Sequence, residues 1–184
     1  MKASSTISIQ NFTYVALMTA ILCILGPIAI PIPFSPVPIS LATFGLYLIA
    51  YIMPWKKAVL SCILYLIIGL AGMPVLSGFS GGFGKVFGPT GGYILAYIPL
   101  VLIVNIFIHR FQSRTSHIFG FILSTIVLYG VGSLWLVYTA NITLKTALFI
   151  GTLPYVPGDV IKIFLALYVG PRIRTQLNKI HSHT

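Results

Sequence analysis

The chain is 184 residues long, with 58% hydrophobic residues, 7% charged residues and a mean hydropathy of +1.03, which excludes an ordinary soluble domain. Its 11 Lys and Arg and single acid give a net charge of +10, but the cations lie mostly at the ends of apolar runs, which favours orientation in a membrane over nucleic-acid binding. We therefore predict an all-α integral membrane protein of one domain, residues 1–184.

Pro, Gly and charged residues divide the apolar sequence into six candidate transmembrane helices. Their ranges are about 12–30, 39–53, 58–71, 92–108, 117–138 and 157–169. The segment 143–156 is also apolar, but Gly151 and Pro154 interrupt it. It is therefore either a separate short helix or an extension of a neighbouring helix.

The placement of charge predicts an even number of spans with both termini in the cytoplasm. With the N-terminus inside, eight cations fall on the inner side: Lys2, Lys56, Lys57, Arg110, Arg114, Arg172, Arg174 and Lys179. The outer side then carries Lys85 and Lys145, and Lys162 lies within the last span. This is the positive-inside pattern of a multi-pass protein, with residues 172–184 as a cytoplasmic tail.

Two irregular segments, about 31–38 and 72–91, fall on the predicted outer face. The stretch PIPFSPVPIS contains four prolines, and SGFSGGFGKVFGPTGGY (77–93) contains seven glycines with aromatic residues between them. Non-helical backbone at membrane depth is tolerated where it is buried in protein or lines a cavity. We predict a pocket with a lid that opens to the outside, and compact re-entrant turns are the alternative.

The single acid, Asp159, lies beside Lys162 in VPGDVIK, at the start of the last apolar segment. Pro157 suits the first position of a helix, which places Asp159 in the first turn and Lys162 on the same face. Counted from Arg172, Asp159 lies about 20 Å above the inner boundary of a hydrocarbon core of about 30 Å. Ionisable groups at such depth mark substrate or ion pathways. We predict a polar ligand site, with a structural ion pair as the alternative.

The remaining residues predict neither an enzyme nor an ATPase. One acid excludes paired carboxylates, a Ser-His-Asp triad and a carboxylate metal site. Gly84 and Lys85 lack the spacing of a phosphate-binding loop, and Val86 stands where Ser or Thr is required. We therefore expect a membrane subunit that captures a substrate and depends on a partner for energy.

Three motifs in order carry a family resemblance: IPIPFSPVPIS, GMPVLSGFSGGFGKVFGPTGGY, and VPGDVIK followed by Pro171-Arg172. They closely resemble the BioY family, the biotin-binding S components of energy-coupling factor (ECF) vitamin transporters. The resemblance covers about residues 12–174. It implies a six-helix S-component fold in a prokaryotic plasma membrane, with biotin as the transported substrate and no cofactor. It also implies import driven by a transmembrane coupling subunit and two cytoplasmic ATPases.

The resemblance also implies roles for particular residues. The family's pocket acid and lysine correspond to Asp159 and Lys162, and its proline-rich gate corresponds to 31–38. Further candidates for ligand binding are Ser77, Lys85, Gly91 and Tyr93 of the glycine-rich loop, and Phe34 of the gate. Ala16 and Ala20 form a small-residue motif expected to pack against the coupling subunit.

The chemistry of biotin fits these residues, but the sequence leaves alternatives open. Asp159 could accept the ureido N–H groups, and either Lys162 or Lys85 could meet the carboxylate. The same fold could instead bind another vitamin or a precursor such as dethiobiotin. A solitary, proton-driven secondary transporter is the alternative from a different class.

Overall fold

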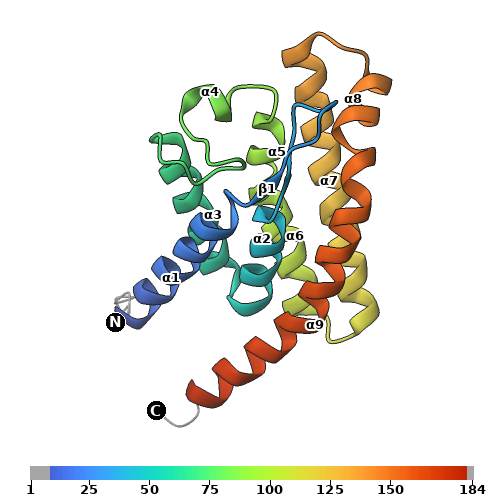
Figure 1. Cartoon of the computed structure of the whole chain (residues 1–184). Helices are drawn as coiled ribbons and strands as arrows, with labels where there is room; N and C mark the ends of the chain where they lie inside the picture. The colour runs from blue at the N-terminus through green and yellow to red at the C-terminus, as the bar shows by residue number, and fades with distance from the viewer. Residues whose placement is uncertain (1–8, 182–184) are drawn as a thin grey trace, which may run out of the picture.

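The structure, a computed structural model, describes residues 9–181 and is mostly helical (Figure 1). Its helices are α1 (Ile9–Leu25), α2 (Ala42–Ile52), α3 (Trp55–Leu70), α4 (Phe83–Val86), α5 (Gly91–Leu95), α6 (Tyr97–Arg110), α7 (Arg114–Ala140), α8 (Leu144–Gly151), the 3₁₀ helix η1 (Leu153–Tyr155) and α9 (Val156–His181). Two short strands, β1 (Ala29–Ile30) and β2 (Ile39–Ser40), pair antiparallel.

The all-α prediction did not include this two-stranded ribbon. The first predicted helix, about 12–30, also extends beyond the observed end of α1 at Leu25. Helix α1 ends at Leu25 because Gly26 and Pro27 follow it, so the chain reaches Ile30 as a strand and not as a helix. Ala29 pairs with Ser40, which brings the two ends of the proline-rich segment 31–38 together. The ribbon therefore holds this segment as a closed loop.

Three helical stretches of the described chain are long and apolar enough to cross a membrane. They are Gly91–Arg110, Arg114–Ala140 and Leu144–Leu177, while Asn11–Leu25 and Ala42–Ile52 are shorter apolar helices. The ambiguous segment 143–156 forms α8 and η1, which lead directly into α9. The predicted count of six spans is not tested by these lengths and stays a prediction.

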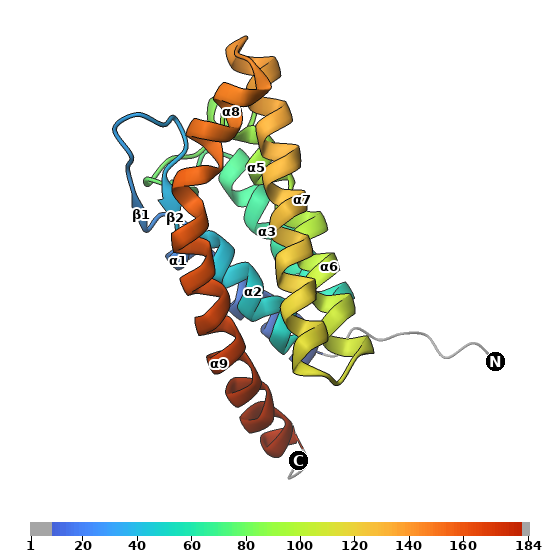
Figure 2. The same ribbon diagram turned by 90° about the vertical axis from the view of Figure 1, so that its right-hand side faces the viewer.

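Helix α2 lies at the centre of the molecule. Eight of its 11 residues are buried, and it packs against α1, α6 and α9 (Figure 2). Its sequence is apolar on all sides, as expected of a helix that other helices surround. Tyr47 of α2 meets the ring of Phe121 of α7 edge to face, with 4.8 Å between the ring centroids.

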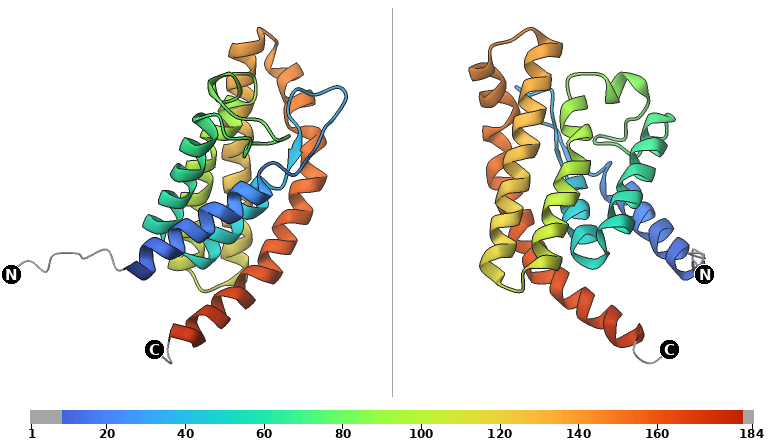
Figure 3. Two further views of the ribbon diagram at one scale, coloured as in Figure 1. Left: turned by 60° about the vertical axis from the view of Figure 1, so that its left-hand side comes forward. Right: turned by 180° about the vertical axis from the view of Figure 1, so that it is seen from behind.

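The turns that carry most of the described cations lie at one end of the molecule. The α2–α3 turn, the α6–α7 turn and the last part of α9 lie at the end where α1 begins (Figures 1 and 3). The α7–α8 turn and the proline-rich loop lie at the opposite end (Figure 2). The prediction that both termini are cytoplasmic requires the cation-rich turns to lie at one end of the molecule, and they do. The orientation of the chain in a membrane stays a prediction.

Candidate functional site

A small cavity lies among α2, α7, η1, α9 and the second strand of the ribbon. Its lining includes Thr43, Tyr93, Tyr97, Tyr129, Tyr155, Asp159 and Lys162. The free space in it is about 50 Å³, which is room for only a few water molecules. The cavity is therefore small in this conformation.

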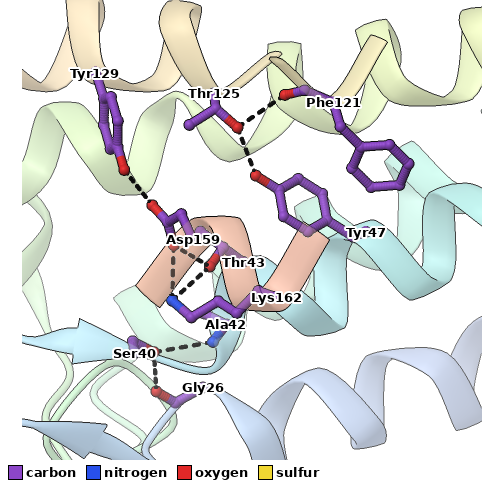
Figure 4. Close-up of polar contacts among 10 residues, drawn as sticks. All are labelled: Gly26, Ser40, Ala42, Thr43, Tyr47, Phe121, Thr125, Tyr129, Asp159 and Lys162. Atoms are coloured by element: carbon purple, nitrogen blue, oxygen red, sulfur yellow. Dashed lines mark hydrogen bonds and ion pairs between the residues drawn. The ribbon is translucent and has the colours of Figure 1, made fainter. Parts of the chain in front are cut away.

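Asp159 and Lys162, which both line this cavity, form a buried ion pair (Figure 4). Lys162 Nζ lies 2.9 Å from Asp159 Oδ1, and the two residues are only 5% and 6% exposed. Asp159 lies in the first turn of α9, as predicted. The sequence left open whether the two residues touch, and the structure shows that they do.

Two hydroxyl groups complete the hydrogen bonding of the pair. The Tyr129 hydroxyl donates to Asp159 Oδ2 at 2.6 Å, and Lys162 Nζ donates to Thr43 Oγ1 at 3.1 Å (Figure 4). An ammonium group has three donors, so these contacts leave one N–H of Lys162 for a ligand. Asp159 likewise keeps acceptor sites on both oxygens. The pair is thus fixed in place and can still bind a polar molecule.

The position of Thr43 follows from the way α2 begins. Ser40 Oγ donates to the Gly26 carbonyl at 2.8 Å and accepts from the Ala42 N–H at 3.0 Å (Figure 4). These two bonds tie the start of α2 to the end of α1. Thr43, in the first turn of α2, is thereby held against the ion pair of α9.

Glycines on α7 and α8 make room for Tyr93. A Cβ atom at Gly132 would overlap the Tyr93 ring, and one at Gly151 would overlap its hydroxyl group. The Tyr93 hydroxyl donates to the Gly151 carbonyl at 2.7 Å, so the ring is fixed as part of the cavity wall. The structure therefore brings the predicted residue Tyr93 to the same cavity as Asp159 and Lys162.

The proline-rich loop is fastened over the cavity by Tyr155. The Tyr155 hydroxyl donates to the Val37 carbonyl and shares a hydrogen bond with Ser35 Oγ, which also accepts from the Val37 N–H at 3.1 Å. Tyr155 lies 6% exposed in η1, and both Val37 and Tyr155 line the cavity. We call the contact of Tyr155 with Ser35 and Val37 the latch.

The other predicted ligand residues lie outside the lining of this cavity. Phe34 is 63% exposed, Ser77 accepts a hydrogen bond from Ser80 through its carbonyl, and Gly91 is buried against Val86 and Trp135. Lys85 is half-buried in α4, and burial lowers the pKa of its ammonium group. Their part in ligand binding stays a prediction.

The lining residues that sequence reasoning missed include Ser40, Thr43, Tyr97, Tyr129 and Tyr155. Each is one of many hydroxyl-bearing side chains within apolar sequence, so composition gave no reason to select it.

In the described residues there is no group of three or more His, Cys, Asp or Glu that could hold a metal ion. Ala16 and Ala20 both lie on the exposed face of α1, four residues apart.

Comparisons with known proteins place these features in a family. Residues 1–179 match the model of the BioY family. The "Biotin transporter BioY" of Lactococcus lactis subsp. cremoris (strain MG1363) is 35% identical over 175 residues, which are 91% of this chain and 92% of the relative. The "Probable biotin transporter BioY" of Pyrococcus horikoshii is 31% identical over 165 residues, 90% of this chain and 96% of the relative.

A solved structure shares both the fold and the sequence pattern. It is the crystal structure of the S-component for biotin from an ECF-type ABC transporter, which superimposes with a TM-score of 0.84 and 32% sequence identity. The match covers 95% of each chain.

Proposed function

Because the chain belongs to the BioY family, we propose that it is the biotin-binding S component of an ECF-type ABC importer. It captures biotin from outside the cell and delivers it through a coupling module that supplies the energy. The observation that carries this proposal is the buried pair of Asp159 and Lys162, the single acid of the chain and its lysine partner, in the lining of a small cavity. An ionisable pair held at this position in an apolar helix is best explained by a polar ligand.

The chemistry of biotin matches the groups that surround the cavity. The two ureido N–H groups donate to Asp159, the tyrosines of the lining cover the fused rings, and a lysine meets the carboxylate. A pocket for a molecule of this kind needs about 300 Å³ or more, whereas the free space is about 50 Å³. Binding therefore requires the latch to open and the loop 31–38 to move.

We further propose that the chain crosses the cell membrane six times, with both termini in the cytoplasm. Its turns rich in Lys and Arg lie at one end of the molecule, which supports an inward position of that end (Figure 3). The cavity then opens at the outer end, beneath the loop 31–38. The domain is the whole chain, 1–184.

The partners of the proposed complex are a transmembrane coupling subunit and two cytoplasmic ATPases. The exposed face of α1 that carries Ala16 and Ala20 supports a contact with the coupling subunit, since small side chains allow helices to approach closely. Biotin is the cargo of this complex, and the proposal includes no cofactor.

The decisive experiment is isothermal titration of the purified protein with biotin. Asp159→Asn removes the charge that fixes the ureido group, and we expect the affinity to fall by about 100-fold or more, because each of the two ureido hydrogen bonds to a charged acceptor contributes about 1.5–3 kcal/mol. The double variant Asp159→Asn/Lys162→Met carries no unpaired buried charge, so it tests binding even if the single variant folds poorly. Unchanged affinity in a folded double variant would contradict the proposal.

A matched pair of tyrosines provides the control. Tyr129→Phe removes the hydroxyl that donates to Asp159, whereas Tyr47→Phe removes a buried hydroxyl that bonds Thr125 and lies outside the cavity lining. We expect weaker biotin binding in the first variant alone. Competition by dethiobiotin would identify a precursor as the better ligand, and uptake without ATPase partners that an uncoupler abolishes would favour a solitary transporter.

A further inference from the structure

A second hollow lies at the other end of α9 from the biotin cavity. It is a groove of about 590 Å³ between the first residue of α7, Arg114, and the α9 residues Leu167, Tyr168, Pro171 and Arg172. The last part of α9 extends beyond the α6–α7 turn (Figures 1 and 2). The groove is thus lined by two arginines and an apolar wall.

The side chain of Arg172 is held in a fixed position in this groove. Its guanidinium carbon lies 3.5 Å from the centroid of the Tyr168 ring, and Nη1 donates to the Tyr168 carbonyl at 2.7 Å. A guanidinium has five N–H donors, so the other donors stay available. An arginine that its own helix already orders loses less side-chain entropy when it binds an anion.

The chain offers these arginines no carboxylate side chain as a partner. Its single acid, Asp159, is bonded to Lys162. Thirteen residues separate Asp159 from Arg172, which is about 20 Å along a helix. The side chains of this protein therefore supply no negative charge to Arg114 and Arg172, which leaves both free to bind an external anion.

The wall of the groove identifies the kind of anion. Tyr168 is 63% exposed, and Phe164 and Leu165 above it are 69% and 47% exposed, so the groove continues into an apolar surface. Aromatic residues are enriched where a helix leaves the hydrocarbon core, and basic pockets at the cytoplasmic ends of helices bind anionic head groups. A ligand with a phosphate at one end and acyl chains at the other satisfies both parts of the surface.

We propose that the groove between α7 and α9 binds the phosphate of an anionic phospholipid in the inner leaflet. Arg114 and Arg172 contact the phosphate, and the side chains of Thr175 and Gln176, which also line the groove, supply polar contacts to the head group. The acyl chains lie along Tyr168 and Phe164. The assignment to the inner leaflet rests on the orientation given with the proposed function.

The test is native mass spectrometry of the full chain purified with equal amounts of phosphatidylglycerol and phosphatidylcholine. We expect the unmodified protein to retain phosphatidylglycerol preferentially. In Arg114→Gln/Arg172→Gln this preference falls at least about tenfold, because both guanidinium groups that donate to the phosphate are lost. The control, Lys56→Gln/Arg110→Gln, removes the same charge from exposed positions at the same end and keeps the preference.

Two results would overturn the proposal. One is equal retention of phosphatidylglycerol by the groove variant and the control, which would show that the lipid follows net charge alone. The other is displacement of the lipid by excess inorganic phosphate, which would identify a site for free anions. Biotin titration of the same variants separates this proposal from the proposed function, since loss of lipid binding with intact biotin binding concerns the groove alone.

Discussion

At the scale of single residues, the charges that line the cavity already balance each other, so a ligand carboxylate needs a cation from outside the lining. Asp159 neutralises Lys162 at 2.9 Å, so the pair has no net charge to offer a second anion. Lys85 of the glycine-rich loop is a further cation, outside the cavity lining. Burial lowers the pKa of its ammonium group because the charged form loses water there. A ligand carboxylate would restore the stability of that charge.

We therefore expect Lys85 to meet the carboxylate of biotin when the loops close over the ligand. Lys85→Met should lower the affinity for biotin by about tenfold or more but leave the affinity for biotin methyl ester unchanged. Titration calorimetry with both ligands measures the difference. An equal loss of affinity for biotin and its methyl ester, or no loss of affinity for biotin, would contradict the role of Lys85. Lys162 would then be the candidate that binds the carboxylate.

The same assignment fixes the sign of a pH effect. The carboxylate binds charged Lys85, so biotin affinity stays constant below the lowered pKa of free Lys85 and falls as the pH rises through it. In Lys85→Met this fall should disappear.

The sequence selected Asp159 and Lys162 as site residues, but it predicted neither their contact nor their surroundings. A lone acid in an apolar chain is conspicuous, and the spacing of three residues places Lys162 on its face. Thr43 and Tyr129 belong to other helices, and their contact with the pair depends on how α2 and α7 pack against α9. No local pattern encodes that packing, so these residues emerged only from the structure.

At the scale of elements, the close approach of α7 to the α5–α6 region depends on small residues. Gly132 of α7 lies against the Tyr93 ring, where a Cβ atom would overlap ring carbons, whereas a Cβ atom at Gly130 would meet no atom within 4 Å. Both glycines belong to the same helix, so the gain in helix propensity on substitution by Ala is expected to be the same at the two positions.

This pair of glycines gives a matched prediction. Gly132→Ala should destabilise the fold by about 1–3 kcal/mol through overpacking, and Gly130→Ala should stabilise it by about 0.5–1 kcal/mol because Gly is a poor helix former. Thermal unfolding in detergent measures both changes. A similar shift for the two variants would show that Tyr93 can move aside without cost.

Apolar runs predicted where helices occur, but neighbouring segments decided where they end. Helix α1 stops at Leu25 because its continuation pairs as a strand with Ile39–Ser40. The segment 143–156 was ambiguous because Gly151 and Pro154 interrupt it, and the structure resolves it as α8 followed by η1. Tyr155 of the latch lies in this ambiguous segment, which explains why its contact with the proline-rich loop was not anticipated.

At the scale of the whole molecule, the proposed orientation follows from where the cations lie. Lys56 lies in the first turn of α3, at the end that holds most of the described cations, and Lys145 lies in α8 at the opposite end. Both side chains are exposed. In the proposed topology, these two positions lie on opposite sides of the membrane.

We expect cysteines at the two positions to react from different sides. In a background with Cys23 and Cys62 replaced by Ala, Lys145→Cys should react with a membrane-impermeant maleimide in intact cells. Lys56→Cys should react only after the cells are permeabilised. Labelling of both from outside, or the reverse pattern, would contradict the topology with both termini in the cytoplasm.

The latch has a consequence for the rates at which the protein works. While Tyr155 holds Ser35 and Val37, the cavity admits a few water molecules at most, so a ligand has to wait for the loop to release. The rate of capture then levels off at high ligand concentration, because it is set by loop opening and not by diffusion. The same contact slows escape, so we expect a bound ligand to have a long residence time in the cavity.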